Sequence, residues 1–378
     1  MELILKQYDI PLLRFSATND SSIPEIEVHW INEDQKHLLP LDMELSPEGI
    51  SRWMRRRTIP RNRAYVNRLL AKCGLNANRP MGILALCKGL SVDDSYWVVE
   101  EGFEGTFEKY NLFENRFSEV LALIAFTGYG SSNRSSLASS PEFTTNGMLP
   151  KCWRRISGKV TLYKGGTDGG YNTGAEPYCE YYAAQVAAAM GIDAIPYGLS
   201  QWKGRLCSTC ELFTDIDHAY MPIGNLVQKG GFDAVVAYYE KLGEPFQKAF
   251  RDMLVFDAVI CNTDRHYGNF GFMIDNKTNT IAAPAPLFDH GNSLFNQAGP
   301  EDYESPEAFQ QYIDTLVPCV YDDFFATAKR FMTDENREQL RKLLGFRFKR
   351  HVRYNLPPKR LKLMEEQVRK RAMRLLEN

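Results

Sequence analysis

Three polar side chains with the chemistry that phosphoryl transfer needs lie between residues 256 and 295. Asp264 and Asn269 belong to a polar loop that follows an apolar run, and Asp289 follows a second apolar segment. Phosphoryl transfer uses one carboxylate to orient the attacking hydroxyl and take its proton. It also uses an amide and a second carboxylate to hold Mg²⁺ on the nucleotide phosphates. The pattern predicts a helix end, a loop and a hairpin, which place all three side chains at element ends where they can face one point.

The spacing of these residues strengthens the prediction. Kinase catalytic loops place the base Asp five positions before the Asn that binds metal, and a further Asp follows after a hairpin. Asp264 precedes Asn269 by five positions, and Asp289 comes twenty residues after Asn269. Taken singly, an Asp or Asn in a loop more often caps the local backbone. The joint spacing favours a phosphotransfer site.

Length and composition indicate a globular protein of two or three domains. The chain has 378 residues, 44% hydrophobic and 24% charged, and its formal net charge of −2 does not suggest a nucleic-acid binder. The N-terminus lacks the basic region and long apolar core of a signal peptide, and no window approaches twenty uninterrupted apolar residues. The eight scattered cysteines look like reduced thiols. We expect a cytoplasmic protein with no membrane partner.

The first 125 residues are predicted to form a unit of their own. An alternating segment at 25–31 predicts a strand, and Ser46-Pro47 predicts the start of two short helices that are broken at 58–60 and stopped at Gly74. Six arginines lie between positions 52 and 63. They could belong to a helix-turn-helix on DNA or RNA, to a solvated helical face, or to a surface for a protein partner or substrate. We favour the last two, and direct nucleic-acid binding stays open as an alternative. A Gly- and Ser-rich linker is expected at 127–141.

A hairpin and a helix follow that could supply a lysine and a glutamate to a nucleotide. The segments 148–155 and 159–164 read as paired strands, and Lys164 ends the second of them just before two glycines. Lys164 can reach the phosphates of a bound nucleotide, although a surface lysine beside a turn is the simpler interpretation. The Ala-rich helix at 176–190 carries Glu176 and Glu180, and its register favours Glu180 as the partner of that lysine.

Two further segments could contact the nucleotide. No G-x-G-x-x-G precedes the lysine, so the best phosphate loop is 143–147, where backbone amides and the hydroxyls of Thr144 and Thr145 could face phosphate. The strand at 206–213 ends in Glu211 and Phe213, which are predicted to form a hinge whose backbone pairs with an adenine edge. Beyond the hinge, the sequence predicts a run of helices that ends with a basic one at 358–377.

This order of parts predicts an α+β protein with a bilobal protein-kinase-like fold. A small β-rich lobe with the lysine, a hinge and a large helical lobe with the Asp/Asn/Asp site would follow an additional N-terminal α/β or mostly helical domain. The expected domains are 1–125 for partner or substrate binding, 126–213 for the kinase N-lobe, and 214–378 for the helical C-lobe.

The motifs resemble those of the HipA-like serine/threonine kinases, and more distantly those of phosphatidylinositol kinases. The match is carried by NTDRHYGNFGF through APLFDHG, in which the Asp precedes its His, and by LYKGG, CEYYAAQVAAAMGIDAIP and CELFTD. Ordinary protein kinases write His-Arg-Asp and Asp-Phe-Gly at the corresponding places. The resemblance covers residues 140–330 and leaves the first 125 residues unexplained.

The resemblance implies a role for each candidate residue. Asp264 would be the catalytic base, and Asn269 and Asp289 would bind Mg²⁺. Lys164, paired with Glu180, would contact the ATP phosphates, and Glu211 and Phe213 would hold the adenine. Thr144 or Thr145 would be the loop hydroxyl that members of this family can autophosphorylate. HipA-like proteins often act as toxins, so the resemblance also implies an antitoxin or another regulatory protein as a partner.

The sequence therefore predicts an ATP- and Mg²⁺-dependent kinase that acts on a serine or threonine of a protein substrate. A kinase for a lipid or small-molecule hydroxyl is the alternative within enzymes. A non-catalytic ATP-binding regulator that contacts nucleic acid through its N-terminal basic helices is the alternative from another class, and the presence of Asp264 speaks against it because a binder needs no base.

Overall fold

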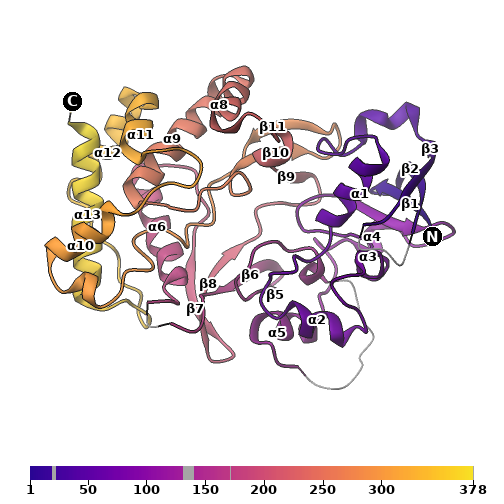
Figure 1. The fold of residues 1–378 in the computed structure, drawn as a ribbon, viewed down its shortest axis with the longest axis horizontal. Coiled ribbons are helices and arrows are strands. Elements are labelled where there is room, and N and C mark those ends of the chain that lie inside the picture. The colour runs from indigo at the N-terminus through magenta and orange to yellow at the C-terminus, as the bar shows by residue number, and fades with distance from the viewer. Residues whose placement is uncertain (19–22, 131–139, 171, 378) are drawn as a thin grey trace. The chain divides into compact units, whose positions relative to one another are not determined.

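The computed structural model describes residues 1–18, 23–130, 140–170 and 172–377, and its chain separates into two units (Figure 1). The first unit comprises residues 1–164, 211–221 and 273–282, and the second comprises residues 165–210, 222–272 and 283–378. Residues 131–139 of the expected linker lie outside the described residues.

The first unit contains an antiparallel sheet with the strand order β3-β2-β1-β4. Side chains of β1 alternate between buried positions and partly or fully exposed ones, as expected for a strand with one face on a core. Leu3 and Leu5 pack on that face together with Ile50 and Trp53 of the helix α1. The strands are β1 (Glu2–Gln7), β2 (Ile10–Ala17), β3 (Ile26–Ile31) and β4 (Tyr96–Glu100).

Helical segments and a hairpin complete most of the first unit. The predicted start of α1 is confirmed, because the Ser46 side chain accepts the Gly49 N–H at 3.1 Å and Pro47 occupies the first turn. The elements are η1 (Glu33–Leu38), α1 (Pro47–Arg56), α2 (Val66–Lys72), α3 (Pro80–Cys87), α4 (Phe107–Tyr110), α5 (Glu119–Thr127), η2 (Pro141–Phe143), β5 (Lys151–Ile156) and β6 (Lys159–Gly165). β5 and β6 pair antiparallel, which confirms the predicted hairpin.

A second sheet draws on segments that are distant in sequence. It has the strand order β11-β10-β9, and most of its residues belong to the first unit. Its strands are β9 (His218–Pro222), β10 (Gly271–Asp275) and β11 (Thr280–Pro284). The turn between β10 and β11 is held by the Asp275 carboxylate, which accepts the N–H groups of Lys277 and Thr278 at 2.8 and 2.9 Å.

The second unit is mainly helical. The hairpin β7 (Gly198–Trp202) and β8 (Arg205–Glu211) is antiparallel. The helices are α6 (Glu176–Met190), α7 (Ile223–Leu226), α8 (Gly231–Leu242), α9 (Glu244–Ile260), α10 (Pro306–Asp314), α11 (Phe324–Phe331), α12 (Asp334–Arg341) and α13 (Pro358–Leu376), with the short η3 (Glu301–Tyr303). These elements confirm the predicted α+β class.

Helix α9 is the centre of the second unit, and α6, α8, α11, α12 and α13 all pack against it (Figure 1). Residues 252–260 of α9 are buried, so its C-terminal half is enclosed on all sides. No helix in the described ranges has both the length and the apolar composition needed to cross a lipid bilayer.

Candidate active site

The loop with the predicted base begins where α9 ends. Cys261 caps the helix in the left-handed region at φ 54°, and its N–H and that of Asn262 both donate to the Asp257 carbonyl. Asp257 is fully buried within an otherwise apolar stretch. A buried carboxylate is unfavourable unless a cation and hydrogen bonds compensate it, so Asp257 needs partners from the loop.

Arg265 supplies that compensation and joins two parts of the site. Its side chain is 1% exposed, and its Nε and Nη2 donate to the Asp257 carboxylate at 2.9 and 3.0 Å. Its Nη1 donates to the carbonyls of Asn269 and Phe288 at 3.1 and 2.6 Å, and its Nη2 donates to His290 Nδ1 at 3.1 Å. Burial alone would lower the pKa of Arg265. The negative charge and the hydrogen bonds of Asp257 have the larger combined effect, and they raise that pKa above its usual value. One charged guanidinium thus fixes the backbone at Asn269 and beside Asp289.

Asp264 is held by its neighbours on both its backbone and its side chain. Its N–H donates to Asn262 Oδ1 at 3.2 Å, and Asn262 in turn donates to Asp257 Oδ1 at 3.0 Å. Its carboxylate Oδ2 accepts a hydrogen bond from Asn292 Nδ2 at 2.8 Å. Asn269 Nδ2 donates to the Asp264 carbonyl at 3.2 Å. The structure therefore brings Asp264 and Asn269 together within the second unit.

Asp289 has an unusual backbone that its surroundings stabilise. Its φ is 56°, in the left-handed region that costs a residue with a Cβ about 1–2 kcal/mol. Its N–H donates to the Tyr197 hydroxyl at 3.1 Å, and the next N–H, of His290, donates to Glu180 Oε2 at 2.8 Å. Burial and the nearby carboxylates of Glu180 and Asp289 raise the pKa of Tyr197 well above its usual value, so this hydroxyl keeps its proton. Glu180, fully buried on α6, thus holds the backbone beside Asp289.

The oxygen donors of this site suit Mg²⁺. Because the Asn269 amide nitrogen is used in the bond to Asp264, its oxygen is the end of the side chain that can face a cation. Asp289 contributes a carboxylate, and Mg²⁺ commonly binds one or two such protein groups together with nucleotide phosphates. No group of three or more His, Cys, Asp and Glu that could hold a metal by itself occurs in the described part of the chain. The oxygens of Asn269 and Asp289 fit Mg²⁺ chemically, and their role as metal ligands stays a prediction.

The predicted phosphate loop at 143–147 lies in the first unit, and its hydroxyls are hydrogen-bonded there. Thr144 is buried, and its hydroxyl donates to the Leu90 carbonyl at 2.8 Å. The Thr145 hydroxyl donates to the Pro141 carbonyl at 2.7 Å and accepts from Trp153 Nε1 at 2.9 Å. Neither hydroxyl can be phosphorylated in this arrangement without the loss of these bonds, and their predicted roles stay predictions.

Two arginines of the basic segment are buried and hold this region in place. Arg63 donates to the Glu142 carboxylate at 2.6 Å, with both side chains fully buried, and to the carbonyls of Glu142, Thr145 and Lys151. Burial raises the pKa of Glu142 although Arg63 opposes this. Arg57 donates to both Asp94 carboxylate oxygens at 2.7 and 2.8 Å. These contacts favour a packing role over nucleic-acid contact for Arg57 and Arg63, whereas Arg52, Arg55 and Arg61 are exposed.

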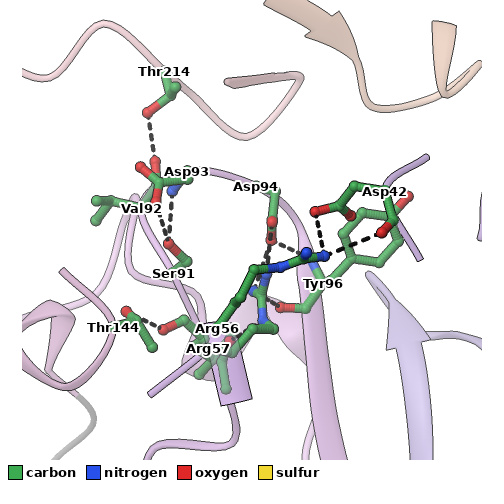
Figure 2. A network of polar contacts seen from close by, with 12 residues as sticks. Asp42, Arg56, Arg57, Ser91, Val92, Asp93, Asp94, Tyr96, Thr144 and Thr214 are labelled. Atoms are coloured by element: carbon green, nitrogen blue, oxygen red, sulfur yellow. Dashed lines mark hydrogen bonds and ion pairs between the residues drawn. The ribbon is translucent and has the colours of Figure 1, made fainter. Parts of the chain in front are cut away.

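Figure 2 shows that the segment 89–96 joins several parts of the first unit. Arg57 donates to the Gly89 and Tyr96 carbonyls, Thr144 donates to Leu90, and Thr214 donates to the Val92 carbonyl. The end of the basic helix α1, the predicted phosphate loop and the segment after the predicted hinge are therefore bound to one stretch of chain.

The remaining predicted nucleotide residues also lie in the first unit. Lys164 is buried at the end of β6. Glu211 is exposed and forms an ion pair with Lys159 at 2.8 Å, and the ring of Phe213 meets that of Tyr220 edge-on at 5.5 Å. The proposed pairing of Lys164 with Glu180 and the adenine contacts of Glu211 and Phe213 stay predictions.

Sequence reasoning missed several residues of the network, among them Asp257, Arg265 and Asn292. Asp257 had a signal, since it is the one charged residue in the apolar run at 253–261 and such a carboxylate must find a cation. Arg265 is the cation, eight positions later in the loop. Asn292 had no signal, because an Asn in a turn after a glycine is usually a local cap.

Comparisons with known proteins give a family resemblance and a fold. No family model matches the chain. A segment is 27% identical over 135 residues to the serine/threonine-protein kinase CtkA of Helicobacter pylori. The match covers 32% of this chain and 41% of CtkA, so this chain spans less than half of the length of that relative. A crystal structure of the Helicobacter pylori proinflammatory kinase CtkA aligns with a TM-score of 0.48 and 16% identity, over 61% of this chain and 90% of that one.

Nearly the whole chain aligns with a second solved structure. The HipA chain in a Shewanella oneidensis complex of HipA, HipB and operator DNA gives a TM-score of 0.52 at 13% identity, over 99% of this chain and 97% of that one. These comparisons confirm the resemblance to HipA-like kinases that the motifs indicated, and they confirm the predicted kinase-like fold.

Proposed function

We propose that the protein is an ATP- and Mg²⁺-dependent kinase that transfers the γ-phosphoryl group of ATP to a serine or threonine of a protein. The observation that supports this most is the network around Arg265. It links Asp264 and Asn269 with the backbone beside Asp289, twenty positions further along the chain, within one set of hydrogen bonds. A protein that only bound nucleotide would not need Asp264 fixed in this way.

In the proposed reaction, Asp264 accepts the proton of the acceptor hydroxyl. The bond between the hydroxyl oxygen and the γ-phosphorus forms while the bond from that phosphorus to the bridging oxygen of ADP breaks. Mg²⁺, held by Asn269 and Asp289, would neutralise charge on the phosphates. Arg265 keeps both ligand-bearing segments in place and does not itself touch the reacting atoms.

The roles of the residues in the first unit belong to the same proposal. Lys164, oriented by Glu180, contacts the ATP phosphates, and Glu211 and Phe213 hold the adenine. Thr144 or Thr145 is the site of autophosphorylation, which would break the hydrogen bonds to Leu90 or Pro141. Mass spectrometry of the 143–147 peptide from active protein and from Asp264→Asn tests this, and a phosphate-free peptide in the active protein counts against it.

A protein that restrains the kinase is the proposed partner. The Shewanella HipA chain is found in a complex with HipB and operator DNA, so an antitoxin that binds this chain and DNA is the analogous arrangement. In that case the basic segment at 52–63 need not contact DNA, in agreement with the buried ion pairs of Arg57 and Arg63.

Labelling with γ-phosphate-labelled ATP tests the function directly. Wild type, Asp264→Asn, Asp289→Asn and the surface control Asp314→Asn are incubated with ATP, Mg²⁺ and casein as a generic acceptor. We expect label on protein with wild type and with the control, on serine or threonine after acid hydrolysis, and none above background with the two site variants. Equal labelling by all four would refute the assignment.

The same assay separates the alternatives. A lipid or small-molecule kinase would place the label in an extracted small product of a cell lysate and leave proteins unlabelled. A non-catalytic regulator would bind ATP and transfer nothing. If protein labelling is found, a phosphoproteome recorded after induced expression of wild type and of Asp264→Asn would identify the natural substrate.

A further inference from the structure

The carboxylate of the proposed base has one side-chain partner. Asn292 Nδ2 donates to Asp264 Oδ2 at 2.8 Å. In the part of the chain that the structure describes, this is the one hydrogen bond that the Asp264 carboxylate makes. Oδ1 is the oxygen that remains for a substrate. The amide nitrogen of Asn292 can only donate and the ionised carboxylate of Asp264 can only accept. This bond therefore makes Oδ2 different from Oδ1.

A second asparagine sets the orientation of the first. Asn296 Nδ2 donates to Asn292 Oδ1 at 2.9 Å, which leaves the Asn292 amide nitrogen to face Asp264. Asn296 is buried, and Arg360 of α13 donates to the carbonyls of Phe295 and Asn296 at 3.1 and 3.0 Å. The amide pair is therefore anchored to the last helix and does not depend on solvent for its geometry.

The backbone of Asn292 is tied to the catalytic loop independently of its side chain. Its carbonyl accepts both the N–H and the hydroxyl of Thr263 at 3.1 Å. A substitution of the Asn292 side chain leaves these two bonds available. The effect of the side chain on Asp264 can thus be separated from the anchoring of the loop.

We propose that Asn292 is a positioning residue for Asp264, and this inference rests on the proposed kinase function. Its amide holds Oδ2 so that Oδ1 is presented to the acceptor hydroxyl, whose proton moves to Oδ1 as the oxygen–phosphorus bond forms. Asn292 touches neither the nucleotide nor the acceptor, and Asn296 keeps it in the donating orientation. A carboxylate that is free to rotate would spend less time in the reactive geometry, which lowers kcat and not nucleotide affinity.

Kinetics of Asn292→Ala test the proposal. The rate of label transfer to casein, or to the chain itself, should show a kcat that is roughly tenfold or more below wild type, while KM for Mg²⁺-ATP changes less than about twofold. Asn355→Ala, which removes another hydrogen-bonded amide of the second unit, is the matched control and should leave kcat unchanged.

Two further variants address orientation and charge. Asn296→Ala retains Asn292 but frees its amide to rotate, so a smaller fall in kcat is expected. Asn292→Asp keeps the shape and can still accept from Asn296, but it sets a second carboxylate against Asp264. Two carboxylates in contact hold a proton more tightly, so the acid limb of the kcat–pH profile should move to higher pH. Loss of packing alone would not move that profile.

A structural measurement guards against misfolding. A crystal structure of Asn292→Ala should retain the Thr263 bonds and show the Asp264 carboxylate in more than one rotamer. If Asp264→Asn is inactive but Asn292→Ala keeps wild-type kcat, the positioning role is wrong and the kinase function stands. If Asp264→Asn transfers phosphate as fast as wild type, the proposed function and the inference both fail.

Discussion

At the scale of single residues, the stability of the site depends on one buried ion pair. Arg265 and Asp257 are 1% and 0% exposed. Removing one partner of such a pair leaves an uncompensated buried charge, which costs about 3–5 kcal/mol. We predict that Arg265→Met lowers the free energy of unfolding by that amount in urea denaturation of the full chain. A loss below about 1 kcal/mol would show that Asp257 is compensated in another way.

Two companion variants test whether charge is the cause. Arg265→Met combined with Asp257→Leu removes both charges and should recover most of the loss. Arg251→Met breaks a bond to Glu244, whose side chain is 72% exposed, and should cost less than about 1 kcal/mol. Equal losses for Arg251→Met and Arg265→Met would contradict the importance of burial.

At the scale of elements, local signals predicted most of the helices and two hairpins, β5–β6 and β10–β11. Ser46 with Pro47, and Gly191 after the Ala-rich run, mark the observed ends of α1 and α6. These features depend on neighbouring residues only. The pairing of β1 with β4 and that of β9 with β10 join strands that lie far apart in sequence, and no local pattern specifies such partners.

The candidate site likewise has features that the sequence predicted and features that it did not. The types and spacing of Asp264, Asn269 and Asp289 were visible in the sequence because each stands at the end of an element. The bond of Glu180 to the His290 backbone was not, because it joins α6 to a turn 110 positions later. Roles follow from residue type, whereas partners follow from tertiary packing.

The segment 89–96 contains a carboxyl whose titration should be measurable. Asp93 accepts a hydrogen bond from the Ser91 hydroxyl at 3.0 Å. Burial, and then the charge of Asp94, raise the pKa of Asp93 to about 6, while Ser91 and Arg57 oppose them. The unfolded carboxyl has a pKa of about 3.9. The folded state therefore holds this proton more tightly, and the stability that Asp93 contributes is fully present below about pH 4 and lost as pH rises through about 6.

We predict that Asp93→Asn removes this pH dependence. The free energy of unfolding of wild type minus that of the variant should be larger at about pH 4.5 than at about pH 7.5, by roughly 1–2 kcal/mol. Urea denaturation at the two pH values measures the difference, and the subtraction cancels the titration of other groups. Asp34→Asn, at an exposed position, should give the same difference at both pH values. A difference for Asp93→Asn that grows with pH would reverse the sign and contradict the cause.

At the scale of the whole molecule, each unit is assembled from three separate segments of chain. Composition does not reveal such an arrangement, since a unit boundary inside a strand carries no linker. The predicted division into 1–125, 126–213 and 214–378 stays a prediction. A ligand that binds the folded chain stabilises it by an amount set by its affinity, whichever segments contribute the contacts.

Stabilisation by a bound nucleotide distinguishes the loss of a metal ligand from the loss of the catalytic base. A non-hydrolysable ATP analogue with Mg²⁺, at about a hundred times its Kd, should stabilise wild type by about 2.7 kcal/mol. Asp264→Asn should be stabilised equally, because it loses the base but no metal ligand. Asp289→Asn should lose the part of the stabilisation that EDTA removes from wild type. Thermal denaturation with nucleotide, with nucleotide and EDTA, and with neither measures these differences. Full Mg²⁺-dependent stabilisation of Asp289→Asn would exclude Asp289 as a metal ligand, and no stabilisation of wild type would exclude the proposed use of ATP.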